Sequence, residues 1–489
     1  MRKNTILALC ALFLIGCKPE VTPNGIDDTL EDNIVLVSYA ETGVQVKANT
    51  ATATLLHIET KATRAKIQQA ADMTAPMTYI LSASATEGSF RLEATSPATI
   101  VLNNVALSTT DKAPLNIHNT ALTTLRLADG TSSSLTTSAP AQKGIKVNGD
   151  LLVDGTGSLS ITTMGDGQWD ELEAGTDAAS CIKVKGHLTI NSGALVLTSG
   201  GSGGKGINCD SVLTINGGNI AVATTGEMYI YEGFAGDSTN IPDSLRTSPK
   251  GVKGEAGVVI NDGYLRISTA ADGGEGLESK ATLVINGGTI EINAFDDCIN
   301  SFGDMTINGG RIYVSSLDND GIDSNYNLFI NGGTIVAYGA PFRELGIDVN
   351  DRGPEKKFYL SGGTLFAVGG SKDVSKPFTS ESMQPAILYN GQIEQGATLL
   401  LSCEGAGIWA ATQERNYTAE GDGTTPPRLA VLISSPDLVV GSSYLLYGGA
   451  TVSGNDWHSL IALPTIAERG TQIGRVTSLE APCTTAKTK

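Results

Sequence analysis

The chain has 489 residues, of which 58 are glycine and only 5% are aromatic, and it carries a formal net charge of −18. This acidic balance argues against nucleic acid as a partner and against electrostatic docking on anionic lipid, and it favours cations or cation-bridged anions. Thr, Ser, Asn and Val are frequent and helical periodicity is rare, which indicates an all-β protein.

The chain begins with two basic residues and a short apolar run, "ILALCALFLIGC", at residues 6–17. The run is too short to span a membrane as a helix. Its end, Leu14-Ile15-Gly16-Cys17, resembles the bacterial lipoprotein signal, which implies cleavage before Cys17 and lipidation of that cysteine; an ordinary secretory peptide is the alternative. We therefore expect an exported protein, anchored by lipid at the outer membrane or cell surface, that touches the membrane only through this lipid.

Five further cysteines are scattered along the rest of the chain. An odd number at wide spacings is neither a disulfide framework nor a CxxC metal site, so buried thiols are expected. These are Cys181, Cys209, Cys298, Cys403 and Cys483.

The organisation changes along the chain. We predict a signal peptide at 1–17, a flexible linker at 18–33, an N-terminal β region at 34–142, a repeat region at 143–371 and a C-terminal β region or cap at 372–489. Two insertions, at residues 165–177 and 224–250, interrupt the repeats. Insertions in repeat proteins fall on loops, often on the binding face.

A turn signal recurs through the repeat region. Each copy follows a short alternating run such as "TLVI", and neighbouring copies are mostly 22–25 residues apart. Short strands with fixed Gly corners at this period predict a right-handed single-stranded parallel β-helix, a solenoid with irregular β regions at both ends. The signal is Asn-Gly-Gly or a close variant at Asn191, Asn216, Asn261, Asn286, Asn308, Asn331 and Ser361.

A second repeating motif carries charge. A Gly/Cys-Ile-like pair recurs in each turn, and the flanking residues change from lysines in early turns to carboxylates in late ones. Carboxylates stacked about 4.8 Å apart repel by roughly 3 kcal/mol at an effective dielectric near 20. A calcium ion, which takes six to eight oxygen ligands, would reverse that repulsion; a solvated acidic edge is the alternative. The candidate ligands are Glu275, Glu278, Asp296, Asp297, Asn300, Asp318, Asp320, Asp323 and Asp348.

The repeats "GIKVNGDLLVDGTGSLSITT", "CINSFGDMTINGGRIYVSS" and "GIDSNYNLFINGGTIVAYG" resemble a bacterial parallel β-helix family of carbohydrate-binding domains. The resemblance covers about residues 78–371. It implies a pectate-lyase-like fold, calcium held on the helix, and binding of cellulose-like or pectin-like polysaccharide. This chain departs from a fully acidic ladder at Lys205, Lys250 and Lys253.

Three functions remain open from the sequence. The first is calcium-assisted, non-catalytic binding of polysaccharide by a surface lipoprotein that is monomeric. The second is a polysaccharide lyase acting by calcium-dependent β-elimination, for which Lys253 is the candidate base. The third is a structural adhesin or spacer that calcium only rigidifies.

Candidate sugar contacts lie mainly in the insertions. Trp169, Tyr229 and Tyr231 stand out in a chain with few aromatics, and aromatic rings are suited to the apolar face of a sugar. Packing of the insertions onto the repeats is the alternative. Lys253, which is expected to point outward, is a further candidate for contact with an anionic sugar.

Overall fold

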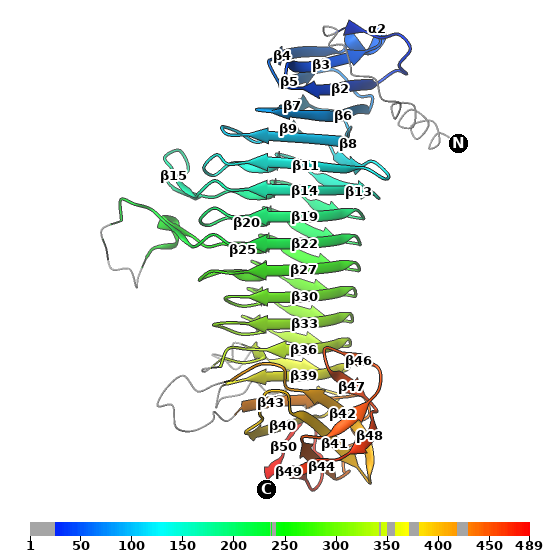
Figure 1. Ribbon diagram of the computed structural model, residues 1–489, viewed down its shortest axis with the longest axis vertical. Coiled ribbons are helices and arrows are strands. Elements are labelled where there is room, and N and C mark those ends of the chain that lie inside the picture. The colour runs from blue at the N-terminus through cyan, green and yellow to red at the C-terminus, as the bar shows by residue number, and fades with distance from the viewer. Residues whose placement is uncertain are drawn as a thin grey trace.

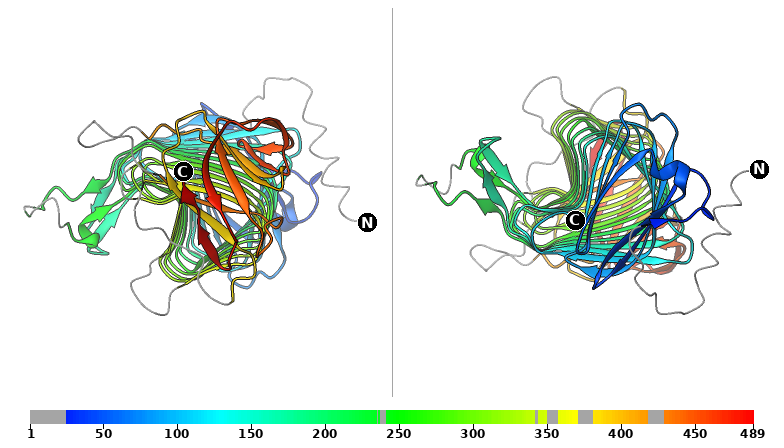
Figure 2. Two further views of the ribbon diagram at one scale, coloured as in Figure 1. Left: turned by 90° about the horizontal axis from the view of Figure 1, so that it is seen from below. Right: turned by 90° about the horizontal axis from the view of Figure 1, so that it is seen from above.

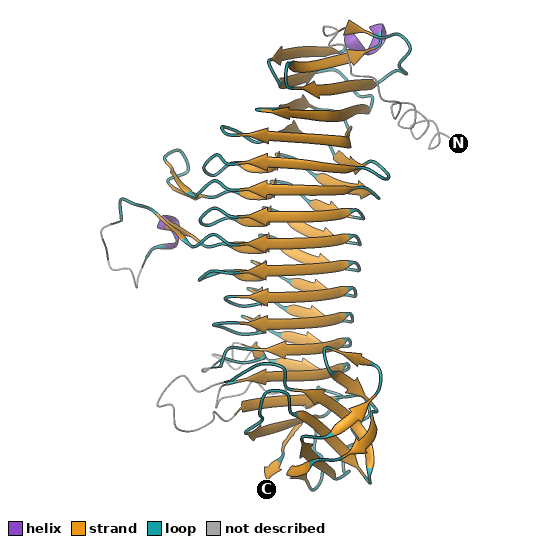
Figure 3. Ribbon diagram, viewed as in Figure 1, coloured by secondary structure: helices purple, strands orange, loops and turns teal. Residues whose placement is uncertain are grey.

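The computed structural model describes residues 25–234, 236, 241–341, 344–349, 357–370, 381–417 and 429–489. Within these residues the elements are almost all strands; the helical exceptions are α2 (Thr50–Ala53) and the 3-10 turn η1 (Asp243–Leu245) (Figure 3). Among them no helix combines the length and apolarity needed to cross a bilayer. The lipoprotein-like start and Cys17 lie outside the described residues.

The N-terminal end of the molecule is a small mixed β region beside α2. β2 pairs antiparallel with β3 and parallel with β6, and β1 lies inside the predicted linker and pairs with β3. The strands are β1 (Gly25–Ile26), β2 (Ile34–Ala40), β3 (Gly43–Ala48), β4 (Leu56–Lys61), β5 (Arg64–Gln69) and β6 (Met77–Thr86).

Parallel strands then stack along the long axis of the molecule in three sets (Figure 1). The chain visits the sets in turn, and each strand pairs parallel with its counterpart one repeat later. The first set is β7 (Ser89–Ala94), β9 (Leu115–Asn119), β12 (Lys143–Val147), β17 (Ser180–Val184), β20 (Lys205–Cys209), β25 (Lys250–Gly254), β28 (Glu275–Ser279), β31 (Ile299–Ser301), β34 (Ile322–Ser324) and β37 (Ile347–Val349). Together with β4 and β5 these strands form a 12-stranded sheet.

The other two sets belong to a 26-stranded sheet. One set is β8 (Ala98–Thr109), β10 (Thr123–Leu127), β13 (Leu151–Gly155), β18 (Leu188–Ile190), β21 (Val212–Ile215), β26 (Gly257–Ile260), β29 (Leu283–Ile285), β32 (Met305–Ile307), β35 (Leu328–Ile330) and β38 (Phe358–Leu360). The other is β11 (Ser132–Thr137), β14 (Ser158–Thr163), β19 (Ala194–Ser199), β22 (Asn219–Thr224), β27 (Tyr264–Thr269), β30 (Thr289–Ala294), β33 (Arg311–Ser316), β36 (Thr334–Tyr338) and β39 (Thr364–Gly369).

The pattern of burial explains why these residues form stacked strands. Alternate side chains are buried, as in β33, where Ile312 and Val314 face inward and rest on Ile290 and Ile292 of β30. The second glycine of each Asn-Gly-Gly corner has a positive φ, for example 85° at Gly288 and 95° at Gly310. Only glycine adopts that conformation without strain, which is why the corner repeats.

The two insertions form hairpins that project from one side of the stack (Figure 2). β15 (Gln168–Asp170) pairs with β16 (Gly175–Asp177), and β23 (Tyr229–Ile230) pairs with β24 (Arg246–Thr247). The hairpins touch each other, since Thr176 Oγ1 donates a hydrogen bond of 2.9 Å to the Arg246 carbonyl.

The C-terminal region covers the lower end of the stack (Figure 1). β43 pairs antiparallel with β39, the last strand of its parallel set, and with β40, which in turn pairs parallel with β50. A separate seven-stranded sheet follows. The strands are β40 (Ala386–Gly391), β41 (Thr398–Cys403), β42 (Ala406–Thr412), β43 (Leu429–Ser434), β44 (Tyr444–Gly448), β45 (Thr451–Ser453), β46 (Asp456–Trp457), β47 (Leu460–Ala462), β48 (Thr465–Glu468), β49 (Thr471–Val476), β50 (Cys483–Thr485) and β51 (Lys487–Thr488).

None of the five cysteines forms a disulfide in the described part of the chain. Cys181, Cys209 and Cys298 are buried as expected, whereas Cys403 and Cys483 are only half-buried. The expectation of buried thiols is therefore wrong for these last two, which lie in the C-terminal region, beyond the repeats.

Candidate functional site

The residues that flank the Gly/Cys-Ile pair form two columns along the 12-stranded sheet. In the column before the pair, Lys205, Lys250 and Glu275 are in register on β20, β25 and β28. In the column after it, the register runs from Lys146 on β12 to Asp348 on β37. The last members of this second column are Lys253, Glu278, Asn300, Asp323 and Asp348.

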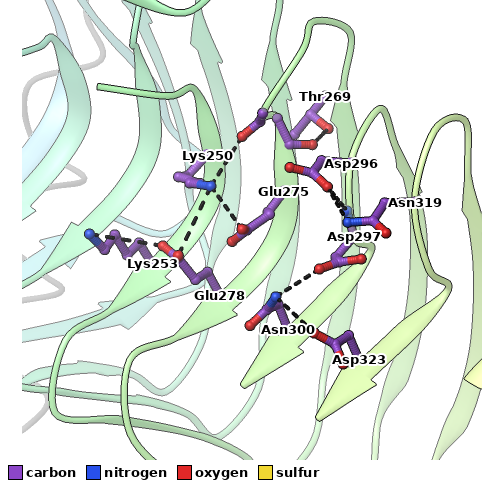
Figure 4. A network of polar contacts seen from close by, with 12 residues as sticks. Lys250, Lys253, Thr269, Glu275, Glu278, Asp296, Asp297, Asn300, Asn319 and Asp323 are labelled. Atoms are coloured by element: carbon purple, nitrogen blue, oxygen red, sulfur yellow. Dashed lines mark hydrogen bonds and ion pairs between the residues drawn. The ribbon is translucent and has the colours of Figure 1, made fainter. Parts of the chain in front are cut away.

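The two glutamates lie against lysines rather than against the aspartates (Figure 4). Lys250 Nζ is 3.1 Å from Glu275 Oε1, and Lys253 Nζ is 3.9 Å from Glu278 Oε2. Lys280 also pairs with Glu278, whose side chain is only 1% exposed. Although burial alone would raise it, the nearby ammonium groups hold the pKa of Glu278 below its ordinary value, while burial raises the pKa of Glu275.

The aspartates further along the columns form a cluster of their own. One carboxylate oxygen from each of Asp320, Asp323 and Asp348 lies within 4.8 Å of the others. Asn300 Nδ2 donates to Asp297 Oδ2 at 2.7 Å and lies 3.4 Å from Asp323 Oδ2. Between β31 and β37, therefore, carboxylates are stacked on carboxylates.

Burial and mutual repulsion disfavour the charged forms of these acids. Burial, with Asp323 and Asp296 nearby, raises the pKa of Asp297 to about 8. Burial also raises the pKa of Asp320 to about 9 and that of Asp323 to about 7, and the Asp348 carboxylate adds to both shifts. A divalent cation among these oxygens would favour the charged forms instead.

Two other predicted ligands lie at the edge of this group. Asp296 Oδ1 accepts hydrogen bonds from Asn319 Nδ2 at 2.7 Å and from the Asp297 amide at 3.0 Å. Asp318 is exposed, and its amide donates to the Phe295 carbonyl at 2.8 Å. The structure thus divides the nine predicted ligands among a lysine-paired end, an aspartate cluster and these two peripheral acids.

Two residues at the columns were not singled out from the sequence. Asn325 Nδ2 donates to Asp323 Oδ2 at 3.2 Å. Its position two residues after Asp323 is the sequence feature that could have indicated this contact. Lys143 precedes the first Gly-Ile pair, and its buried Nζ lies 2.8 Å from Asp177 Oδ2 in the first insertion. The spacing of the repeats could not predict this partner, because Asp177 belongs to an insertion and has no equivalent residue in the other repeats.

The predicted aromatic contacts lie in the two hairpins. The rings of Trp169 and Tyr231 are 4.6 Å apart with an interplanar angle of 33°, and both side chains are half-buried. Tyr229 lies over Gly167, where an added Cβ would be 2.6 Å from its ring. Trp169 and Tyr231 therefore pack on each other. Lys253, the other predicted sugar contact, lies on β25 in the second column, beside Glu278.

Comparison with known proteins identifies the family. The sequence profile of a family described as "Carbohydrate-binding domain-containing protein" matches residues 68–169 and 139–321, together just over half of the chain. The chain belongs to this family. No curated protein matches it.

One solved structure is similar to this carbohydrate-binding family member. It is described as the structure of the polysaccharide lyase-like protein from C. thermocellum, gadolinium derivative. The match has 19% sequence identity, a TM-score of 0.27, and coverage of 65% of this chain and 91% of that chain. A TM-score this low does not establish a shared fold.

The resemblance to a carbohydrate-binding family is confirmed, although the matched range begins earlier and ends earlier than expected. It includes Glu275, Glu278, Asp297 and Asp320 and stops at residue 321. Asp323, Asp348 and the C-terminal sheet lie beyond it. Family membership supports polysaccharide as the partner of this chain.

Proposed function

We propose that this protein binds acidic polysaccharide without cleaving it, through calcium held at the aspartate cluster. The observation that carries the proposal is the stacking of Asp320, Asp323 and Asp348, whose carboxylate oxygens lie within 4.8 Å of one another. The glutamates two repeats before Asp323 have lysine partners. Membership of a carbohydrate-binding family supports the glycan.

The residues fit a calcium ion in number and chemistry. Carboxylate and amide oxygens are the ligands that calcium prefers, and Asp320, Asp323, Asp348 and the Asn300 side-chain oxygen supply them. Nearby, Glu275 Oε2 is buried without a hydrogen-bond partner among the described residues. Bound calcium would supply positive charge, and carboxylates of a uronate chain could complete its oxygen shell.

The proposal also concerns the arrangement of the three strand sets. We propose that the three sets of parallel strands are the walls of one right-handed parallel β-helix. Support comes from the order in which the chain visits the sets and from the constant register between successive repeats. Such a scaffold repeats a binding slot at each turn, which suits a repeating polymer.

The ion pairs of Lys253 favour a binding function over lyase chemistry. Its Nζ lies 2.7 Å from Glu255 Oε1 and 3.9 Å from Glu278 Oε2, and its side chain is only 18% exposed. An ammonium enclosed between two carboxylates acts as an ion-pair partner.

We further propose export and a lipid anchor at Cys17 at the outer membrane or cell surface, supported by the lipoprotein-like start of the sequence.

The test is retardation of the mature protein in native gels containing polygalacturonate, with calcium or with EDTA. We expect retardation in calcium that EDTA abolishes and that Asp323→Asn weakens by about tenfold in apparent affinity, because one charged ligand is lost. Asp72→Asn, an exposed acid far along the chain from the cluster, is the matched control.

Unchanged mobility in every gel would refute glycan binding at this site. If calcium then still raised the melting temperature, the ion would serve the scaffold alone, as in a structural adhesin. An unsaturated uronate product that disappears in Lys253→Ala would instead show a lyase.

A further inference from the structure

A cavity of about 560 Å³ lies where the C-terminal sheet meets the parallel stack. Figure 1 shows β46 and β47 beside β36 and β39 at this end of the molecule. One wall consists of Arg311, Thr334 and Thr364, which occupy the same register position on β33, β36 and β39. The other wall is Asn455, Asp456, Trp457, Leu460 and Ala462. The volume is within the range of pockets for small ligands.

The β46–β47 hairpin is fixed to the stack by aromatic contacts. The His458 ring is stacked on Tyr313 with centroids 3.8 Å apart and an interplanar angle of 19°. Trp457 Nε1 lies 3.4 Å from the Ile312 carbonyl, to which it donates, and the Arg311 guanidinium lies 4.4 Å from the centre of the indole. The indole is thereby held at the edge of the cavity.

The turn of this hairpin is conformationally unfavourable. Trp457 pairs with Leu460, so the turn has two residues, and both have positive φ: 44° at His458 and 64° at Ser459. Hairpins of this kind normally use Asn or Gly at these positions. Strain of this sort persists where the surroundings impose it, and it clusters at functional sites.

The cavity is lined by both hydrogen-bond donors and acceptors, and only some of them are bonded within the protein. Arg311 Nη2 donates to the Asp456 carbonyl at 3.2 Å. In the described part of the chain the Asp456 carboxylate, the Asn455 side-chain amide and the hydroxyls of Thr334 and Thr364 make no hydrogen bond or ion pair. The cavity therefore offers donors and acceptors beside an indole and the apolar side chain of Leu460.

We propose that this cavity is a second carbohydrate-binding site, which takes a neutral pyranose unit without calcium. A pyranose has an apolar face that suits the indole and hydroxyls that both donate and accept hydrogen bonds. Arg311 and Asp456 balance in charge, which disfavours an anionic sugar relative to a neutral one. The site goes beyond the proposed function and lies almost entirely outside the matched family range.

The test is isothermal titration calorimetry of the mature protein with cellohexaose and xylohexaose in EDTA. We expect saturable binding of at least one of them, weakened by about tenfold or more in an Asn455→Ala, Asp456→Ala variant, because hydrogen bonds to an amide and a charged group are lost. Both side chains are exposed, so the variant should keep its melting temperature. Asp72→Ala is the matched control and should bind like the unmodified protein.

The proposal is wrong if neither oligosaccharide binds in EDTA, or if the double variant binds as tightly as the unmodified protein. If the double variant melts early, Thr364→Val replaces it, since that change removes a hydroxyl at nearly constant volume. The double variant should still be retarded by polygalacturonate in calcium. Loss of that retardation in Asp323→Asn with intact cellohexaose binding would separate the two sites.

Discussion

Lys205 differs from the other buried lysines of the first column. Lys143 has Asp177 as a partner and Lys250 has Glu275. Lys205 Nζ instead donates to the Gly203 carbonyl at 3.0 Å and to Thr247 Oγ1 at 2.8 Å, and among the described residues it has no carboxylate partner. Burial, with the charge of Lys253 nearby, lowers its pKa from 10.5 to about 7.

We expect Lys205→Met to stabilise the protein at pH 6. Between pH 7 and 10.5 the folded state binds fewer protons at Lys205 than the unfolded chain, so the stability of the unmodified protein rises with pH across this interval. The substitution removes a cost on the order of 1–3 kcal/mol at pH 6, and its advantage disappears near pH 10. Urea unfolding at pH 6 and 9.5 measures both effects.

Lys143→Met is the matched comparison, because burial lowers the pKa of Lys143 as well but the Asp177 carboxylate opposes that shift. Its stabilising effect at pH 6 should therefore be smaller than that of Lys205→Met. A Lys205→Met protein that is less stable than the unmodified protein at pH 6 would show that the two hydrogen bonds of Lys205 outweigh the cost of its burial.

At the scale of elements, the asparagines of the Asn-Gly-Gly corners form a ladder down the stack. Each asparagine after Asn191 donates from Nδ2 to Oδ1 of the asparagine one repeat earlier, at 2.7–2.8 Å. Asn286 both donates to Asn261 and accepts from Asn308, whereas Asn331 only donates. The corners therefore link neighbouring repeats through side chains as well as through the backbone.

Asn286→Ala should lower the free energy of unfolding by about twice as much as Asn331→Ala. The first change removes two hydrogen bonds and the second removes one, each contributing about 0.5–1 kcal/mol at an exposed position. Urea midpoints of the two variants at constant m-value measure the difference. Equal effects would show that the ladder contributes nothing beyond the turn preference of asparagine.

The ladder illustrates what the sequence could predict. The period and the Gly corners follow from local patterns, and a constant period also aligns equivalent slots, as with Glu278 and Asp323. The same patterns do not predict which charged side chains form ion pairs. Glu278 and Asp323 occupy the same slot, yet one lies against lysines and the other against aspartates, because each side chain responds to neighbours on three strands and in the loops.

At the scale of the molecule, burial changes character where the C-terminal region packs on the stack. In β30 buried and more exposed side chains alternate, whereas in β36 and β39 both faces are buried. The outward side chains Val336, Tyr338, Phe366 and Val368 belong to a separate core formed with strands of the C-terminal sheet. The sequence indicated a cap but not which strands it covers, since contacts between distant segments leave no periodic signal.

Removing the cap should make the stack associate. A chain ending at residue 370 would expose Tyr338 and Phe366, which are fully buried in the whole protein, as one apolar surface. We expect oligomers in analytical ultracentrifugation and strong binding of a hydrophobic dye. A truncated chain that also carries Tyr338→Thr and Phe366→Thr restores the polar outward face of the earlier strands and should be largely monomeric. If the unsubstituted truncation is itself monomeric and binds no dye, the C-terminal region is an attached module rather than a required cap.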